Sequence, residues 1–505
     1  MSSSATHHYP DTPLAMFLGN TPVWYKQAVL AALVLNVVFY FALGSLITSW
    51  IILFEFIFTL AMALKCFPLQ PGGLLAIQVL VMQLTDTHHV YEEVEHGLPV
   101  ILLVIFMVAG VHFLREMLFM SMNKVLLGIK SRVIMNVTTI VVVAVLSAFL
   151  DALTILAVLI ALATAFYDVY DKVVSKIGFT DDPADSQDNH IEDLHREDLD
   201  GFRTFLRGLL MHGAIGTAIG GVCTLVGEPE NIVIGSAAEW DFVTFATMVG
   251  PATIPTLIAG IFTCFVLEKM GWFGYGAELP AAVRKILADE NEKLKQKATK
   301  GDTLVIYFQL AVAILMVVAL SLHLAEIGLI GLAVIILASS LIGVTDEHSI
   351  GQSFTEGLPF ASLLVVFYVI VAMINSQEMF TPVMNWVLAM EGSQQVFMVF
   401  LTNGFLSAIS DNVFVATIYM NQITPLMEQG LMTREIFEAQ SVAVVMGTGI
   451  PSMSTPNGQA AFLFLLMSSI APRIRLGYGR MIYMALPYFL VTSTVAGIIM
   501  YNWLD

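Results

Sequence analysis

The sequence predicts an all-α polytopic membrane protein with about eleven transmembrane helices plus two re-entrant hairpins, arranged in two inverted-topology repeats. Hydrophobic residues make up 57% of the 505 residues and charged residues only 12%, against roughly 25% charged in a soluble domain. Apolar runs of roughly 20 residues, the length that crosses a bilayer as a helix, recur along the chain, and the mean hydropathy is +0.81. The net charge of -18 provides no basic stripe for phosphates, so no nucleic-acid partner is expected.

The expected organisation begins with a cytoplasmic N-terminal segment, 1–27, and an extra first span, 28–48. A first repeat covers 49–267, a basic cytoplasmic linker 268–302, and a second repeat 303–505. Spans are expected near residues 28–48, 50–65, 72–84, 98–119, 204–236, 243–267, 303–323, 326–344, 358–375, 441–470 and 481–503.

Two further apolar stretches, about 133–167 and 395–427, are longer than one membrane crossing, and each has an aspartate near its middle. Irregular backbone at membrane depth is tolerated only where protein or a wet cavity satisfies it. Each stretch therefore predicts a re-entrant hairpin.

The distribution of basic residues predicts the orientation, because Lys and Arg accumulate in cytoplasmic loops. With the N-terminus inside and both hairpins returning to their own side, every Lys and Arg except Arg434 lies on the cytoplasmic side. The acidic loop 168–203 also falls inside, and its composition favours disorder.

An internal repeat accompanies this pattern. Its matches share one ungapped offset of 260 residues: Thr85, Asp86 and His88 with Thr345, Asp346 and His348; Gly97, Leu98 and Pro99 with Gly357, Leu358 and Pro359; and Ser147, Ala148 and Asp151 with Ser407, Ala408 and Asp411. In the predicted topology the two copies run in opposite directions. Inverted repeats are typical of secondary transporters, whose substrate sites lie near the midplane where the repeats meet.

Polar residues at the predicted midplane indicate a cation. Each half offers an aspartate at a hairpin tip, in "SAFLDALT" (147–154) and "SAISDNVF" (407–414). Each tip is expected to face a broken span, in "GTAIGGVCTLVGEPENI" (216–232) or "GTGIPSMSTPNGQAAF" (447–462). Carbonyl, carboxylate, amide and hydroxyl oxygens form the hard ligand shell that an alkali cation needs.

Asp151 and Asp411 allow two interpretations. Each could cap the helix that follows it, accepting backbone N–H bonds. Alternatively each could bind a proton or a cation, since burial disfavours the charged form of a carboxylate and allows either occupant. Glu228 and Glu230 either only line a hydrated vestibule or bind a partner residue, or they coordinate the ion directly. Glu55 is expected to reach water near a span end.

The hairpin tips and broken spans, together with "FIFTLAMALKCFPLQPGGLLAI" (56–77), closely resemble the NhaB-type Na+/H+ antiporters of Gram-negative bacteria. The resemblance extends from about residue 17 to beyond 490. It implies membership of the ion-transporter superfamily that includes the divalent-anion:sodium symporters, and hence a homodimer with scaffold and transport domains and an elevator-like motion.

The symporters of that superfamily carry a Ser-Asn-Thr motif at their hairpin tips, whereas this chain has "LDALT" and "SDN". Two added carboxylates would repel an anionic substrate in a poorly screened site. The ion and proton site is therefore expected at Asp151, Thr154, Asn231, Ser410, Asp411, Asn412 and Asn457, with Glu228, Glu230, Ser454 and Thr455 as secondary candidates.

These inferences predict a Na+/H+ antiporter of the bacterial inner membrane that expels Na+, with Li+ as a second candidate, by alternating access driven by the proton-motive force. No cofactor is expected. The alternative is a Na+-coupled symporter of a small organic or inorganic anion. An enzyme is not expected, because the chain has neither a His-Glu-x-x-His nor a Gly-x-Ser-x-Gly motif.

Overall fold

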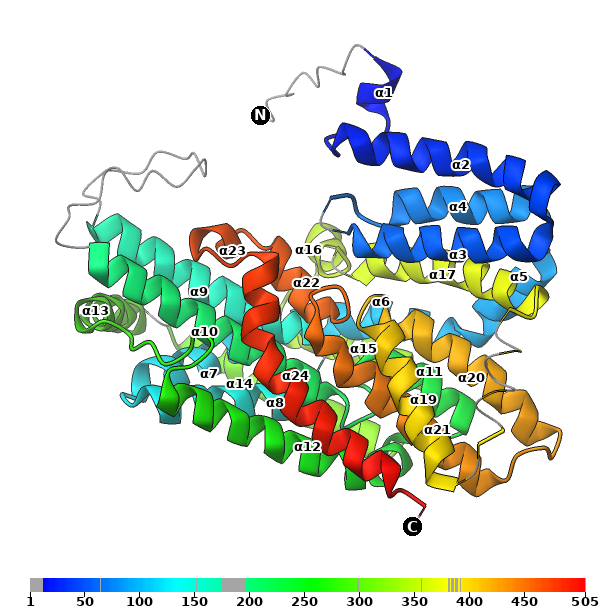
Figure 1. The fold of residues 1–505 in the computed structure, drawn as a ribbon. Coiled ribbons are helices and arrows are strands. Elements are labelled where there is room, and N and C mark those ends of the chain that lie inside the picture. The colour runs from blue at the N-terminus through cyan, green and yellow to red at the C-terminus, as the bar shows by residue number, and fades with distance from the viewer. Residues whose placement is uncertain are drawn as a thin grey trace. The chain divides into compact units, whose positions relative to one another are not determined.

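The computed structural model describes residues 12–63, 65–150, 152–174, 196–297, 299–355, 357–379, 382, 386, 389, 390 and 392–504. All regular elements in these ranges are helices (Figure 1). Six helices are long and apolar enough to cross a membrane: α2, α9, α12, α14, α17 and α24. The number is seven if α5 and α6 together form one broken span. The chain is therefore an all-α polytopic membrane protein.

The expected spans that fall outside this group are shorter or interrupted helices. Apolar helices of 10–17 residues occur at Ser45–Ala61, Leu69–Val81, Arg132–Ser147 and Ile327–Ile342. Helix length and composition thus identify fewer spans than the hydrophobic pattern alone.

The chain divides into two compact units, the first of which comprises Met1–Leu98 and Pro359–Asn385. Among its described residues, α2, α3 and α4 pack against one another (Figure 1). The elements of this unit are α1 (Pro13–Met16), α2 (Val23–Leu43), α3 (Ser45–Ala61), α4 (Leu69–Val81), α5 (Thr87–His96) and most of α17 (Gly357–Ser376).

Two features fix α2, which begins before the expected span of 28–48. Lys26 lies in its first turns with a buried side chain, and its Nζ donates hydrogen bonds to the carbonyls of Leu14, Ala15 and Gly19 at 3.1, 2.8 and 2.6 Å. The helix ends at Gly44, whose φ of 87° lies in the left-handed region that favours glycine. The hydropathy pattern stays apolar across this turn, so the span predicted from it both begins and ends about five residues after the helix.

A polar network lies within the first unit. The amide of Asn36, which is fully buried on α2, donates to Glu55 Oε2 at 2.6 Å and to Gln78 Oε1 at 3.0 Å. Gln78 in turn donates to the carbonyl of Leu33 at 2.6 Å. Glu55 therefore binds a buried amide of a neighbouring helix, instead of only reaching water as expected.

The second unit comprises Pro99–Leu358 and Trp386–Asp505. The helices in its described part are α6 (Leu98–His112), α7 (Arg115–Gly128), α8 (Arg132–Ser147), α9 (Ala152–Val174), α10 (Arg196–Gly221), α11 (Pro229–Ala238), α12 (Phe242–Met270), α13 (Ala281–Lys297), α14 (Lys300–Ser321), α15 (Ile327–Ile342), α16 (Glu347–Ser353), α19 (Gly392–Ser407), α20 (Asn412–Glu428), α21 (Arg434–Gly449), the 3-10 helix η3 (Pro451–Ser454), α22 (Ala460–Met467), α23 (Ile470–Arg473) and α24 (Tyr478–Tyr501). The helix α13 occupies the second half of the segment 268–302 that was expected to be a basic linker. Most of the acidic loop, 175–195, lies outside the described residues.

Helix boundaries in the second unit follow the offset of 260 residues. Within it, α8 and α19 have equivalent ends at Ser147 and Ser407, and α9 and α20 begin at the equivalent residues Ala152 and Asn412. In each case the first helix of the pair packs against a later one, α8 against α10 and α19 against α21. Both long apolar stretches are therefore divided into two helices at the expected positions.

Among the described helices of the second unit, α12 is the longest, with 29 residues and two internal prolines, Pro251 and Pro255. Asp241 caps its start by accepting a hydrogen bond from the backbone N–H of Thr244 at 2.6 Å. Gly271, at a φ of 70°, ends it. Because α12 packs along both α8 and α24, it connects helices from the two halves of the sequence.

Candidate ion-binding site

The second hairpin tip places three of the predicted site residues side by side in sequence. Asp411 is the N-cap of α20, and its Oδ1 accepts hydrogen bonds from the backbone N–H groups of Val413 and Phe414 at 2.9 and 3.3 Å. Ser410 and Asn412, on either side, are buried. The capping role considered for Asp411 is therefore present, and it places the carboxylate at a helix N-terminus, where the helix dipole favours a negative charge.

The first broken span lies between α10 and α11. The helix α10 ends at Gly221, and α11 begins at Pro229, a favourable first residue because its missing N–H needs no partner. Asn231 is fully buried and bonds the irregular segment between the two helices: its Nδ2 donates to the carbonyls of Gly221 and Thr224 at 2.9 and 2.7 Å.

Glu228 is packed against the end of α10. A Cβ added to Gly221 would lie 2.8 Å from the Oε1 atom of Glu228, so a larger residue there would force the Glu228 side chain to move. Both Glu228 and Glu230 are buried, at 4% and 2% exposure. These carboxylates are not in a solvated vestibule, which was one of the two expectations for them.

The structure brings the second hairpin tip to the first broken span. The Nδ2 atom of Asn412 donates to Glu230 Oε1 at 3.0 Å, and α20 packs along α11. Asn412 is next to Asp411 in sequence, and Glu230 is next to Asn231. Residues from the two halves, separated by 182 positions, thus form one buried polar cluster.

The second broken span runs from the end of α21 through η3 to α22. Its turn is held by Gln459, whose Nε2 donates to the carbonyl of Gly449 at 3.1 Å and to Ser452 Oγ at 3.0 Å. Gly458 approaches the hairpin so closely that an added Cβ would lie 2.6 Å from the carbonyl oxygen of Ser407. The break and the tip of its own half are therefore in direct contact.

A threonine in each break binds the hairpin tip of the same half. The hydroxyl of Thr224 donates to the carbonyl of Ala148, and the hydroxyl of Thr455 donates to the carbonyl of Ala408. Ala148 and Ala408 are equivalent in the repeat. In the first half, Ser147 adds a second contact by donating to the carbonyl of Thr217 at 3.0 Å.

Several buried oxygens in this cluster accept no hydrogen bond from the part of the chain that the structure describes. They are Asn231 Oδ1, Ser410 Oγ and Asn412 Oδ1. Buried polar atoms without partners are rare, since each carries a desolvation cost of about 1–3 kcal/mol. Amide and hydroxyl oxygens of this kind, together with nearby carboxylates, are the ligands that a hard cation prefers.

The other predicted site residues are placed less fully. Asp151 lies outside the described residues. Thr154 is buried on α9, while Ser454, Thr455 and Asn457 are half-buried in the second break.

The sequence interpretation missed two residues that hold the breaks. Thr224 and Gln459 both lie within the motifs that were noted, but neither carries charge and neither was selected. The signal available was a polar residue inside a glycine-rich interruption of an apolar span. Such a residue must find a partner at membrane depth.

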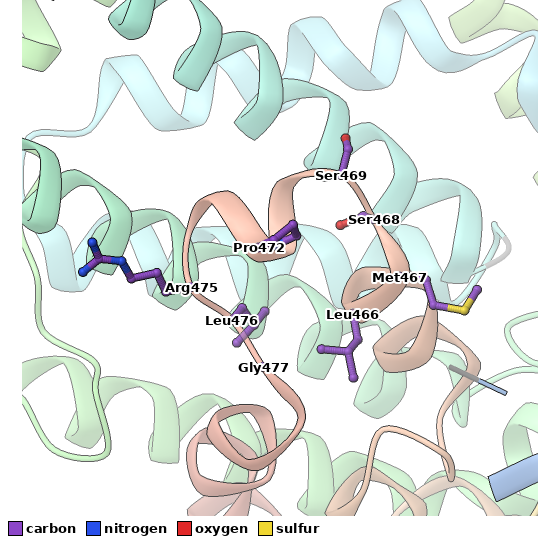
Figure 2. A pocket seen from close by; sticks show the side chains of 8 residues that line it. All are labelled: Leu466, Met467, Ser468, Ser469, Pro472, Arg475, Leu476 and Gly477. Carbon is purple, nitrogen blue, oxygen red and sulfur yellow. The ribbon is translucent and has the colours of Figure 1, made fainter. Parts of the chain in front are cut away.

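A surface hollow of about 730 Å³ is lined by residues 466–469, 472 and 475–477 (Figure 2). Its lining contains none of the predicted site residues. Arg475, its one charged lining residue, points away from Ser468 and Ser469 in this view. The hollow is therefore not the expected ion site.

Comparison with known protein families shows which family this chain belongs to. A family model described as "Bacterial Na+/H+ antiporter B (NhaB)" matches residues 10–504. The chain belongs to the NhaB family. An NhaB protein of Saccharophagus degradans is 53% identical over 479 residues, covering 95% of this chain and 96% of the relative. An NhaB protein of Hahella chejuensis is 53% identical over 482 residues, with the same coverage of 95% and 96%. Both relatives are named Na+/H+ antiporter NhaB.

Proposed function

We propose that this protein is a secondary active antiporter that expels Na+ in exchange for protons across the bacterial inner membrane, with Li+ as a second candidate cargo. Membership of the NhaB family over nearly the whole chain supports this function. The structural observation that carries it is the buried cluster in which Asn412 contacts Glu230 beside Asp411 and Asn231. The cluster supplies carboxylates that can hold a proton and oxygens that can hold a cation.

Exchange follows from competition for one set of oxygens. A protonated carboxylate is neutral and a poor ligand for Na+, whereas a deprotonated one attracts the cation at short range in a poorly hydrated site. When the site faces the acidic periplasm it takes protons; when it faces the cytoplasm it releases them and binds Na+. The proton-motive force drives the cycle, with the electrical part contributing about 2.3 kcal/mol per charge per 100 mV.

We assign the ion and proton site to Asp151, Asp411 and the polar residues around them. Asp411 serves two purposes in this proposal, since an N-cap carboxylate with one oxygen bonded to backbone N–H groups keeps its other oxygen for an ion. The remaining residues proposed for the site are Thr154, Asn231, Ser410, Asn412 and Asn457, with Glu228, Glu230, Ser454 and Thr455 as further ligands. No cofactor takes part in this cycle.

The proposed architecture has eleven spans, two re-entrant hairpins and two inverted repeats, with the N-terminus in the cytoplasm. The equal offset of the helix ends at both tips, and the equivalent hydrogen bonds of Thr224 and Thr455, support a repeat. A homodimer with elevator-like motion remains part of the proposal.

The alternative, sodium-coupled uptake of an anion, has no cationic anchor to support it. No Lys or Arg occurs in residues 147–154, 216–232, 407–414 or 447–462, the segments that form both tips and both breaks. An anion held there would face the carboxylates of Glu230 and Asp411 without a compensating charge.

The test uses everted vesicles from cells that lack other sodium exchangers, with and without this protein. A pH gradient is formed first, and Na+ is then added with either a permeant or an impermeant anion. Collapse of the gradient that depends on Na+ but not on the anion is expected. Collapse only in the presence of a transported anion, or no collapse with inserted protein, would contradict the proposal.

A further inference from the structure

A second buried cluster of titratable side chains lies in the second unit, where α10, α12 and α24 meet. His212 of α10 is fully buried, and its Nε2 lies 2.8 Å from Glu268 Oε1 on α12, itself 1% exposed. The other ring nitrogen, Nδ1, lies 2.7 Å from the hydroxyl of Tyr488 on α24. Tyr275 stacks on the imidazole with ring centroids 4.4 Å apart.

The cluster can satisfy the same hydrogen bonds with or without one proton. When His212 is charged, both ring N–H groups donate, one to Glu268 and one to the Tyr488 oxygen, and the pair is neutral. When His212 is neutral, Nε2–H still donates to Glu268 while the Tyr488 hydroxyl rotates and donates to Nδ1. Only the net charge differs, from zero to one negative charge.

The negative state is the less stable one inside the protein. Glu268 Oε2 has no hydrogen-bond partner among the described residues, so that oxygen would carry charge without compensation. Burial of an unpaired charge is costly, whereas a buried neutral pair with good geometry is tolerated. Loss of the proton therefore weakens the packing that joins the three helices.

The groups facing His212 come from few elements. They are Glu268 and Cys264 of α12, Tyr275 of the following loop and Tyr488 of α24; Cys264 Sγ lies 3.9 Å from Nε2. Several charged groups on helices packed against α10 have partners elsewhere. They are Arg132 of α8 with Glu278, Asp168 of α9 with Arg473, Arg284 of α13 with the Ile129 carbonyl, Arg434 of α21 with Glu438, and Arg480 of α24 with the Arg475 carbonyl. Of the other elements packed on α10, α22 contains no ionisable residue.

The cluster is close to solvent at one end of α12 and connected to both broken spans. Glu268 is followed at once by the exposed residues Lys269 and Met270, where α12 ends. The helix α10 leads from His212 directly into the first break. On α24, the carbonyl of Tyr488 accepts from Thr492, whose hydroxyl also lies 3.8 Å from the sulfur of Met453 in η3.

We propose that His212 and Glu268 form a second proton-binding site, separate from the ion cluster, through which cytoplasmic pH sets the rate of exchange. This proposal rests on the proposed antiport function and on the topology that places the end of α12 in the cytoplasm. The bound proton holds α10, α12 and α24 together and slows the cycle. Release of the proton to water near Lys269 leaves the buried charge and allows the breaks to move.

The test measures the exchange rate at saturating Na+ as a function of pH on the cytoplasmic face, which everted vesicles expose to the medium. Saturating Na+ overcomes protons that compete at the ion cluster. The wild-type rate is expected to rise with pH by about fivefold or more, the lower end of usual coupling between sites. Glu268→Gln keeps the cluster neutral, so its rate should stay at the wild-type acid value throughout.

Two further variants separate a proton site from simple packing. Tyr488→Phe removes the acceptor of the charged imidazole, and since hydrogen bonds to charged groups are the stronger ones, its profile should shift to lower pH. His112→Gln, at the half-buried end of α6, is the matched control and should follow the wild type. A Glu268→Gln profile that rises like the wild type would overturn the proposal.

A second measurement does not depend on transport. Solution 15N spectra of histidine-labelled protein, with His212→Gln used to assign the signal, should show the ring nitrogens of His212 changing state over the same pH range. Constant shifts would also overturn the proposal. If the wild type fails to exchange Na+ for protons but His212 titrates, the proposed function fails and the proton site stands without a role in rate.

Discussion

The most informative substitution concerns Asp411, because the structure gives it a capping role beside its proposed ionic role. Asparagine caps a helix about as well as aspartate does, while alanine removes the cap. Asp411→Asn should therefore leave the free energy of unfolding nearly unchanged. Asp411→Ala removes the acceptor for the N–H groups of Val413 and Phe414 and should lower it by about 1 kcal/mol.

In Asp411→Asn, the exchange rate should fall although the stability does not. If the carboxylate binds the proton and Na+ in turn, both variants lose exchange down to the level of vesicles without the protein, since neither asparagine nor alanine can take up the proton. Thermal unfolding in detergent gives the first quantity, and gradient collapse in everted vesicles gives the second. Asp241→Asn is the matched control: Asp241 also caps a helix, α12, but is exposed, and its variant should exchange normally.

The result that would refute the reasoning is specific. If Asp411→Asn exchanges Na+ at the wild-type rate and only Asp411→Ala is impaired, then Asp411 is a helix cap and no more. The ion site would then have to lie on the other carboxylates of the cluster.

Three other predictions concern buried amides and an exposed cap. Asn231→Ala removes the amide that donates to the carbonyls of Gly221 and Thr224 and should cost about 1–3 kcal/mol of stability, visible as a lower thermal midpoint; an unchanged midpoint would contradict the bonds described. Asn36→Leu should destabilise by a similar amount, because Glu55 loses its donor, yet the apparent Na+ affinity of folded protein should not change. The N–H of Thr244 holds the pKa of Asp241 below its ordinary 3.8, so the stabilising effect of that carboxylate exists above this value and is lost as pH falls below it. The difference in unfolding midpoint between wild type and Asp241→Asn should therefore shrink below about pH 3.8, and a constant difference would speak against it.

The sequence was informative where a local rule acts alone. An aspartate inside an apolar stretch predicted a helix interruption, and Asp411 is the N-cap of α20. Glycine and proline clusters predicted the interrupted spans, and the helices end at Gly221 and Gly449. In both cases one residue and its neighbours suffice, because backbone conformation is decided over a few positions.

Side-chain contacts between residues far apart in the sequence could not be predicted from such local rules. The sequence pattern placed each hairpin tip opposite the break of its own half, and Thr224 and Thr455 make those contacts. It did not predict the additional bond from Asn412 of the second tip to Glu230 of the first break. The pairing of His212 with Glu268 was also missed, although each is an ionisable residue in an apolar surrounding. Hydropathy indicates that a polar group at depth needs a partner, and it does not say which one.

The length of α12 has a consequence for the bilayer around it. Its 29 residues extend about 43 Å, while the hydrocarbon core of a membrane is about 30 Å thick. The helix must therefore tilt, bend at Pro251 and Pro255, or extend into the headgroup layer, and each adjustment changes with lipid chain length. Reconstitution in lipids of graded acyl length would stretch or relax this one helix, so membrane thickness becomes a mechanical variable for the transporter.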